Sequence, residues 1–131
     1  MKKFLFALLP LLFVSTLVFA QDAPYTYHLN GTIVDRDFSG QHKDDINTAV
    51  AAYTKEAALQ LSAIASGYGI LVEDGYMIFN KKSNDKIVEF LKKPDSNLVV
   101  DVEAEIDEDF EKGDNILNIT TIANKSKEMT E

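Results

Sequence analysis

The segment Ile33–Asp45, "IVDRDFSGQHKDD", concentrates the side chains most suited to chemistry. Asp35, Asp37 and Ser39 occupy positions one, three and five of a calcium loop, and Gly40 stands at position six, where such a loop turns sharply. Position twelve is Ile46 instead of the bidentate Glu, and the preceding residues are typical of a strand, which excludes an EF-hand. A looser calcium site is one hypothesis, with the candidate ligands Asp35, Asp37, Ser39, Asp44 and Asp45.

The same segment also has an ordinary structural interpretation, which we favour. Short Asp, Ser and Gly runs are common in turns, so we expect Asp35 to end a strand and residues 36–45 to form a loop in which Ser39-Gly40 turns the chain. Asp44 or Asp45 is then expected to cap a helix.

A transition-metal site built from the two histidines is less favoured. His28 precedes Asp35 by seven residues, which is roughly 23 Å in an extended strand. His28 and His42 could share a metal only if the loop folded back sharply, so we expect both to be exposed.

The chain contains no motif that specifies an enzyme. It has no Gly-x-Ser-x-Gly elbow, no phosphate-binding Gly loop and no metalloprotease His pair. The carboxylates of residues 101–107 alternate along a predicted strand, which is typical of a solvated sheet face. We therefore expect a protein that is not an enzyme and that needs no cofactor, calcium excepted.

The N-terminus is predicted to be a signal peptide over residues 1–20. Lys2 and Lys3 precede an apolar run from Phe4 to Phe19, and Ala20 fits a signal-peptidase site before Gln21. The run contains Pro10 and is short for a membrane span, so we expect cleavage, no membrane insertion, and a periplasmic or secreted protein.

The charge restricts the partners of the mature chain. Removing Lys2 and Lys3 leaves 11 basic against 21 acidic residues, a formal charge of −10. Such a chain repels nucleic acid and anionic lipid, so we expect neither as a partner. The chain has no Cys, which excludes disulfides and thiol chemistry.

Hydrophobic periodicity predicts the elements that must position these residues. We expect strands over residues 25–35, 98–107 and 115–123, and a hairpin with a primed turn at Asp74-Gly75. In residues 98–107, Leu98, Val100, Val102, Ala104 and Ile106 are expected to face the core. Helices are expected over residues 44–66, with a break possible at Thr54, and over residues 83–94, with Ser83 as cap. Gly67 is expected to end the first helix in a left-handed conformation.

This order, β-α-β-β-α-β-β, predicts a mixed α+β fold with an OB-like small barrel, in which a short helix lies between the third and fourth strands. Residues 21–124 are expected to form one domain, followed by a flexible tail over residues 125–131. The segments Gly69–Val72, Asp74-Gly75 and Tyr76–Phe79 give the chain a resemblance to small exported bacterial domains of OB-like type. Some of those domains carry a Cys pair on the first helix, where this chain has "AVAAYTKEAA", so the resemblance implies fold and export and no thiol activity.

Three classes of function follow. The first is a non-enzymatic module of the bacterial envelope that binds a protein or small ligand or has a structural role. The second is a calcium-dependent binding domain that uses the loop from Asp35 to Asp45. The third, least favoured, is a small secreted enzyme.

Overall fold

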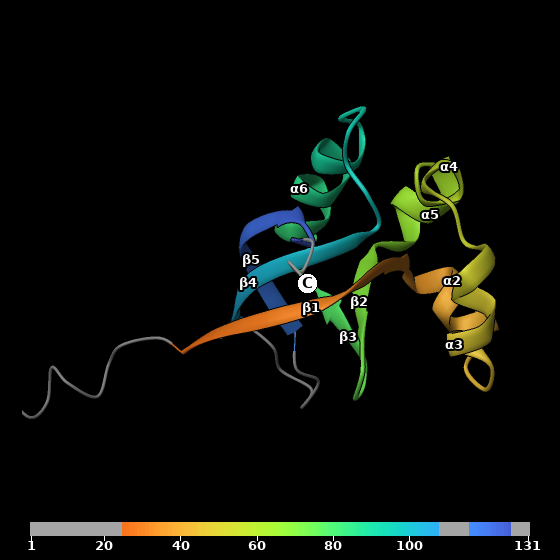
Figure 1. Cartoon of the computed structure of the whole chain (residues 1–131), viewed down its shortest axis with the longest axis horizontal. Helices are drawn as coiled ribbons and strands as arrows, with labels where there is room; N and C mark the ends of the chain where they lie inside the picture. Colours follow the sequence, from red (N-terminus) through yellow and green to blue (C-terminus); the bar gives the residue numbers. More distant parts are fainter. Residues whose placement is uncertain (1–24, 108–115, 127–131) are drawn as a thin grey trace, which may run out of the picture.

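The computed structural model describes residues 25–107 and 116–126, which form a mixed α+β domain (Figure 1). In chain order its elements are β1 Thr26–Asp35, α2 Arg36–Gln41, α3 Ile46–Ala49, the 3-10 turn η2 Val50–Ala52, α4 Lys55–Ala58, α5 Leu61–Ser66, β2 Tyr68–Val72, β3 Gly75–Phe79, α6 Lys81–Leu91, β4 Val99–Ile106 and β5 Ile116–Asn124.

The five strands form a sheet that closes in a ring, in the order β1-β2-β3-β5-β4. Neighbouring strands are antiparallel except β3 and β5, which pair in parallel through Ile78–Ile116 and Phe79–Leu117. Strand β1 pairs with β4 over Thr26–Thr32 and then with β2 over Thr32–Asp35. Gly31 lies at this transfer, where a Cβ would stand 2.3 Å from the carbonyl oxygen of Leu71. A side chain there would prevent the close approach of the two strands.

The hydrophobic core fills the interior of the ring, and the alternating burial along β4 illustrates this. Val100, Val102 and Ala104 are buried, whereas the acidic side chains between them are only partly buried. This alternation confirms the prediction from the sequence. The core is completed mainly by residues of the other strands and of α6: Ile33, Val34, Tyr68, Ile70, Phe79, Ile87, Leu91, Leu117 and Ile119.

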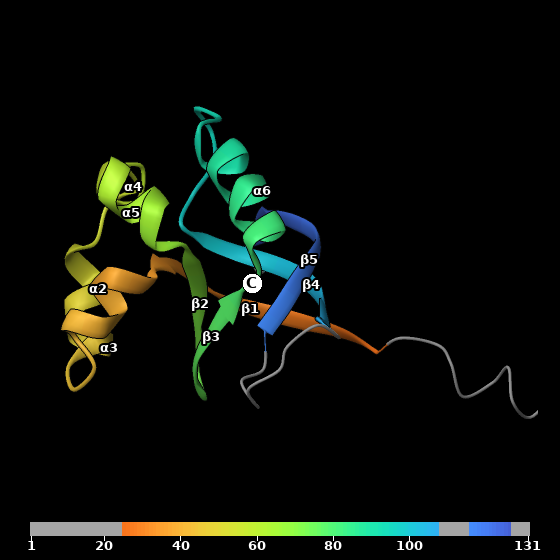
Figure 2. The ribbon, with the colours of Figure 1, turned by 180° about the vertical axis from the view of Figure 1, so that it is seen from behind.

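Figures 1 and 2 show α2–α5 as one group beside the strands, with α6 as a separate helix above the sheet. The prediction of a loop over residues 36–45 is wrong in part, because α2 occupies Arg36–Gln41. The carboxylate of Asp35 caps this helix by accepting a hydrogen bond from the Phe38 amide at 2.8 Å. The residue expected to end the strand therefore also begins a helix.

The helix predicted over residues 44–66, with a break possible at Thr54, is more divided than expected. The segment is divided into α3, η2, α4 and α5. Tyr53 has extended backbone angles, and the Thr54 side chain caps α4 by accepting from the Ala57 amide. The possible break at Thr54 is thus confirmed. Asp45 is the N-cap of α3, but its side chain makes no capping hydrogen bond.

The hairpin is present, but its turn lies one residue earlier than predicted. Val72 pairs with Gly75, so Glu73 and Asp74 form the turn. Among the described residues only Gly67 and Gly75 have positive φ, so the primed turn with positive φ at Asp74 is wrong. Gly75 has φ 146° and begins β3. Gly67 ends α5 with a positive φ of 86° as predicted, but its ψ of 177° is extended and not that of the left-handed helical region.

Helix α6 begins before the predicted residue 83. Its cap is Asn80, whose side-chain oxygen accepts from the Ser83 amide at 2.9 Å. Ser83 is buried, and its hydroxyl accepts a hydrogen bond from the Ile119 amide on β5 at 2.8 Å. This residue therefore joins the helix to the sheet and is not the cap.

Two predictions lie outside the described residues: the signal peptide over residues 1–20, and the tail from residue 127 onward. No helix within residues 25–107 and 116–126 is long and apolar enough to cross a bilayer.

Candidate functional site

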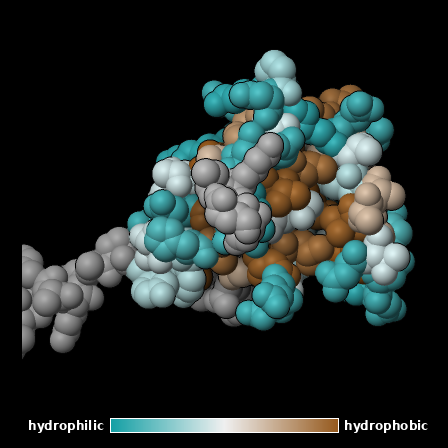
Figure 3. Space-filling view, in the orientation of Figure 1, coloured by the Kyte–Doolittle hydropathy of each residue, from teal (hydrophilic) through white to brown (hydrophobic). Residues whose placement is uncertain are grey.

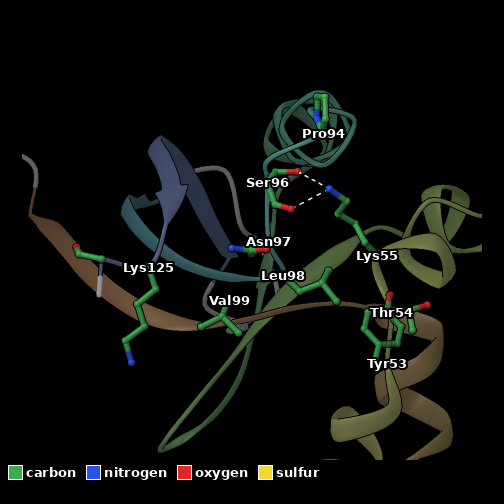
Figure 4. A pocket seen from close by; sticks show the side chains of 10 residues that line it. Tyr53, Thr54, Lys55, Pro94, Ser96, Asn97, Leu98, Val99 and Lys125 are labelled. Atoms are coloured by element: carbon green, nitrogen blue, oxygen red, sulfur yellow. Dashed lines mark hydrogen bonds between the residues drawn. The ribbon is translucent and has the colours of Figure 1, made fainter. Parts of the chain in front are cut away.

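A cleft of about 870 Å³ opens between the helical group and the start of β4 (Figure 4). Figure 3 shows apolar surface in the middle of the same face, surrounded by hydrophilic residues. The residues that line the cleft come from three segments: Tyr53, Thr54 and Lys55; Pro94, Ser96, Asn97, Leu98 and Val99; and Lys125 and Ser126.

Lys55 fixes one wall of the cleft to the other. Its ammonium donates to the carbonyl oxygens of Lys93 at 3.1 Å and Ser96 at 2.8 Å, and to the Ser96 hydroxyl at 3.1 Å. These acceptors lie just beyond the C-terminal end of α6, where a cation is favoured. An ammonium has three hydrogens, so this geometry uses all of them within the protein. Lys55 is therefore a clamp between α4 and the segment that leads into β4.

Tyr53 fixes the same wall of the cleft through hydrogen bonds to Asp35. Its hydroxyl donates to the Asp35 carboxylate at 2.5 Å and accepts from the Asp35 amide at 3.2 Å. Asp35 is 5% exposed, and its carboxylate also accepts hydrogen bonds from the Phe38 amide at 2.8 Å and the Ser66 hydroxyl at 3.4 Å. Burial, followed by the hydrogen bond to Asp35, raises the pKa of Tyr53 far above its usual range. The phenol stays protonated and donates to the buried charge.

The floor and the far end of the cleft differ from this rigid wall. Leu98 is half-buried and Val99 is 44% exposed, so the start of β4 presents apolar surface to solvent. The Lys125 amide donates to the Val99 carbonyl at 3.0 Å, which places these two residues side by side. The Lys125 side chain is exposed, and its ammonium pairs with no group in the described part of the chain. Among the residues that the structure describes, the cleft thus combines an apolar floor with one lysine whose ammonium has no partner.

The electrostatic character of the cleft is opposite to that of the whole chain. The chain has 21 acidic and 13 basic residues, but the ten described residues that line the cleft include two lysines and no carboxylate. The adjoining carboxylate of Asp101 accepts hydrogen bonds from the amide and the hydroxyl of Ser126, both at 3.1 Å. Among the described residues, the lining of the cleft therefore offers a ligand positive charge and hydroxyl groups.

The predicted metal ligands do not converge. Asp35 is buried among its hydrogen-bond donors, whereas Asp37 is exposed and accepts from Gln41 at 3.1 Å. Asp45 lies 3.2 Å from the His42 ring, Asp44 is exposed, and Ser39 faces a second cleft of about 480 Å³ beside the hairpin.

His28 lies elsewhere, 3.9 Å from Glu103 on the sheet surface. In residues 25–107 and 116–126 no three His, Asp or Glu side chains group in a way that could hold a metal ion. The calcium site stays a prediction for titration to test.

The sequence analysis did not identify Lys55, Val99 or Lys125 as site residues. Lys55 and Lys125 lack any local pattern, because their partners are distant in sequence. Val99 did carry a signal: alternation places it on the outward row with Asp101, Glu103 and Glu105, where it is the apolar exception.

Comparisons of this chain with protein-family models, with curated proteins and with solved structures found no match.

Proposed function

We propose that this chain is an exported, non-enzymatic binding module of the bacterial envelope with an OB-like sheet, and that the cleft between α4 and β4 is its binding site. One observation carries the proposal: a cleft of about 870 Å³ with an apolar floor and, among the described residues that line it, no carboxylate, in a chain of net charge −8. Ligand sites of small molecules are commonly clefts of about 300–1,000 Å³, with an apolar lining and a few polar groups.

The OB-like assignment is supported by connectivity. The ring order β1-β2-β3-β5-β4, the parallel contact of β3 with β5 and the position of α6 between β3 and β4 all agree with that architecture. OB folds often bind ligands with the loops between strands one and two and between strands four and five. Here α2–α5 fill the first of these connections, and this connection supplies one wall of the cleft.

The positions and hydrogen-bond partners of the titratable groups favour a binding role over catalysis. The two histidines, His28 and His42, lie beside surface carboxylates. The buried carboxylate of Asp35 receives hydrogen bonds from a phenol, an amide and a hydroxyl, an arrangement that stabilises the fold. The small-enzyme alternative predicts turnover in an untargeted hydrolase panel, and the binding proposal predicts none.

Export is the second element of the proposal. The basic start and apolar run predict a mature N-terminus at Gln21 in the periplasm or medium. Intact mass spectrometry of the protein from a bacterial host should find this N-terminus, with or without cyclisation of Gln21. A soluble cytoplasmic protein that retains Met1 would contradict export.

Binding is tested by two-dimensional ¹⁵N NMR of the mature chain against a library of small soluble fragments. The amides of Val99, Asn97 and Lys125 should shift together for the hits. The second cleft, reported by Asn47 and Leu71, is an internal control. Hits that move only the second cleft, or a library without hits, would contradict the proposed site.

A further inference from the structure

We propose that the cleft between α4 and β4 discriminates by charge and binds a free apolar carboxylate, whose negative group pairs with Lys125 while its apolar body lies on Leu98 and Val99. This inference rests on the proposed function and specifies its ligand class.

The first step separates the two lysines. The ammonium of Lys55 donates its three hydrogen bonds to Lys93 and Ser96. Lys55 therefore shapes the cleft and has no donor left for a ligand. Lys125 lies at the other end of the cleft, where its backbone amide bonds to the Val99 carbonyl and its side chain is exposed (Figure 4). Of the two lysines among the described lining residues, Lys125 is therefore the one with which a ligand anion can pair directly.

The second step concerns the apolar part. Val99 is 44% exposed at the first position of β4, and Leu98 lies beside it on the cleft lining. Covering such surface contributes about 25 cal/mol per Å² of apolar area removed from water. A fully polar anion cannot obtain this contribution, whereas a carboxylate with an aromatic or alkyl body obtains it together with the ion pair.

The third step excludes a membrane headgroup as the source of the anion. The chain carries a net charge of −8, and β4 presents Asp101, Glu103 and Glu105 on its outer face. An anionic bilayer would meet this charge before the cleft and be repelled. A small free carboxylate carries a single negative charge, so it meets much less repulsion than an anionic bilayer surface does.

Three soluble probes with the same body and different charge test the proposal: 3-phenylpropionate, 3-phenylpropanol and 3-phenylpropylamine. In ¹⁵N NMR titrations the acid should bind most tightly and the amine most weakly. Lys125→Gln should weaken acid binding by about two- to fivefold, the factor for one exposed ion pair, and leave alcohol binding unchanged. Lys82→Gln is the matched control, because it makes the same charge change at an exposed residue in the first turn of α6.

The outcomes separate the inference from the proposed function. If acid and amine bind equally at the cleft, or if Lys125→Gln has no effect, the proposed specificity for carboxylates is wrong. The proposal that the cleft is a binding site then still stands. If no probe moves the cleft amides, the inference fails, and the proposed function fails only if the fragment library also leaves them unmoved. Sedimentation with phosphatidylglycerol vesicles should leave the protein in solution. Co-sedimentation that Lys125→Gln abolishes would overturn the inference in favour of a headgroup.

Discussion

Replacing Tyr53 by Phe should destabilise the domain, because this change removes one hydroxyl and keeps the ring. The hydroxyl donates to the Asp35 carboxylate at 2.5 Å and accepts from the Asp35 amide at 3.2 Å. A hydrogen bond to a charged group contributes about 1.5–3 kcal/mol and a neutral one about 1 kcal/mol, so the expected loss is roughly 2–4 kcal/mol. Asp35 is 5% exposed, so water cannot readily replace the phenol.

Urea unfolding followed by circular dichroism measures this change. With an m-value of about 2 kcal/mol/M, the midpoint of Tyr53→Phe should fall by roughly 1–2 M. Tyr25→Phe is the matched control, because Tyr25 is 71% exposed and should leave the midpoint nearly unchanged. If both variants unfold at the same urea concentration as the wild type, the hydrogen bonds between Tyr53 and Asp35 do not hold the helical group on the sheet.

Three further predictions address the turn, the acidic segment and the buried phenols. Gly75→Ala should destabilise by about 1–3 kcal/mol in urea unfolding, because φ of 146° strains any other residue, whereas Gly40→Ala in α2, with open space around it, should not destabilise. In thermal melting at equal ionic strength, calcium and magnesium should have the same effect, and a calcium-specific rise that Asp37→Asn abolishes would instead establish the calcium loop. Burial raises the pKa of Tyr68 to about 12, so the folded state holds this proton more tightly than the unfolded state does. Stability should be unaffected by Tyr68 below its ordinary pKa of about 10 and fall between there and its folded value. Urea midpoints across this range should fall less steeply for Tyr68→Phe, and equal slopes would be evidence against the shift.

The strands could be predicted because their signal is local. Val100, Val102 and Ala104 alternate with acids, and alternation has the same period as the pleat. The hairpin was misplaced by one residue because glycine serves both at the second position of a primed turn and directly after a turn. Periodicity cannot distinguish these uses, but the observed Val72–Gly75 pairing does.

The helical group and the cleft could not be predicted, because each depends on partners distant in the sequence. Apolar residues recur at helical spacing across residues 44–66, yet Tyr53 leaves the helix to reach Asp35, 18 residues earlier. Lys55 is positioned by Ser96, 41 residues later. Asp35 was assigned to a strand end or a metal site, and its roles as helix cap and phenol acceptor need that same long-range contact. The pattern of residue types along the sequence gives no sign of either the Tyr53–Asp35 contact or the Lys55–Ser96 contact.

The most direct test of the central claim is an isotope-filtered nuclear Overhauser experiment on the mature chain, with labelled methyl groups and unlabelled 3-phenylpropionate. The phenyl protons should give cross-peaks to the methyl groups of Leu98 and Val99, which line the cleft beside Lys125. Cross-peaks to Leu71 and Val72 in the second cleft, with none to Leu98 or Val99, would contradict the account.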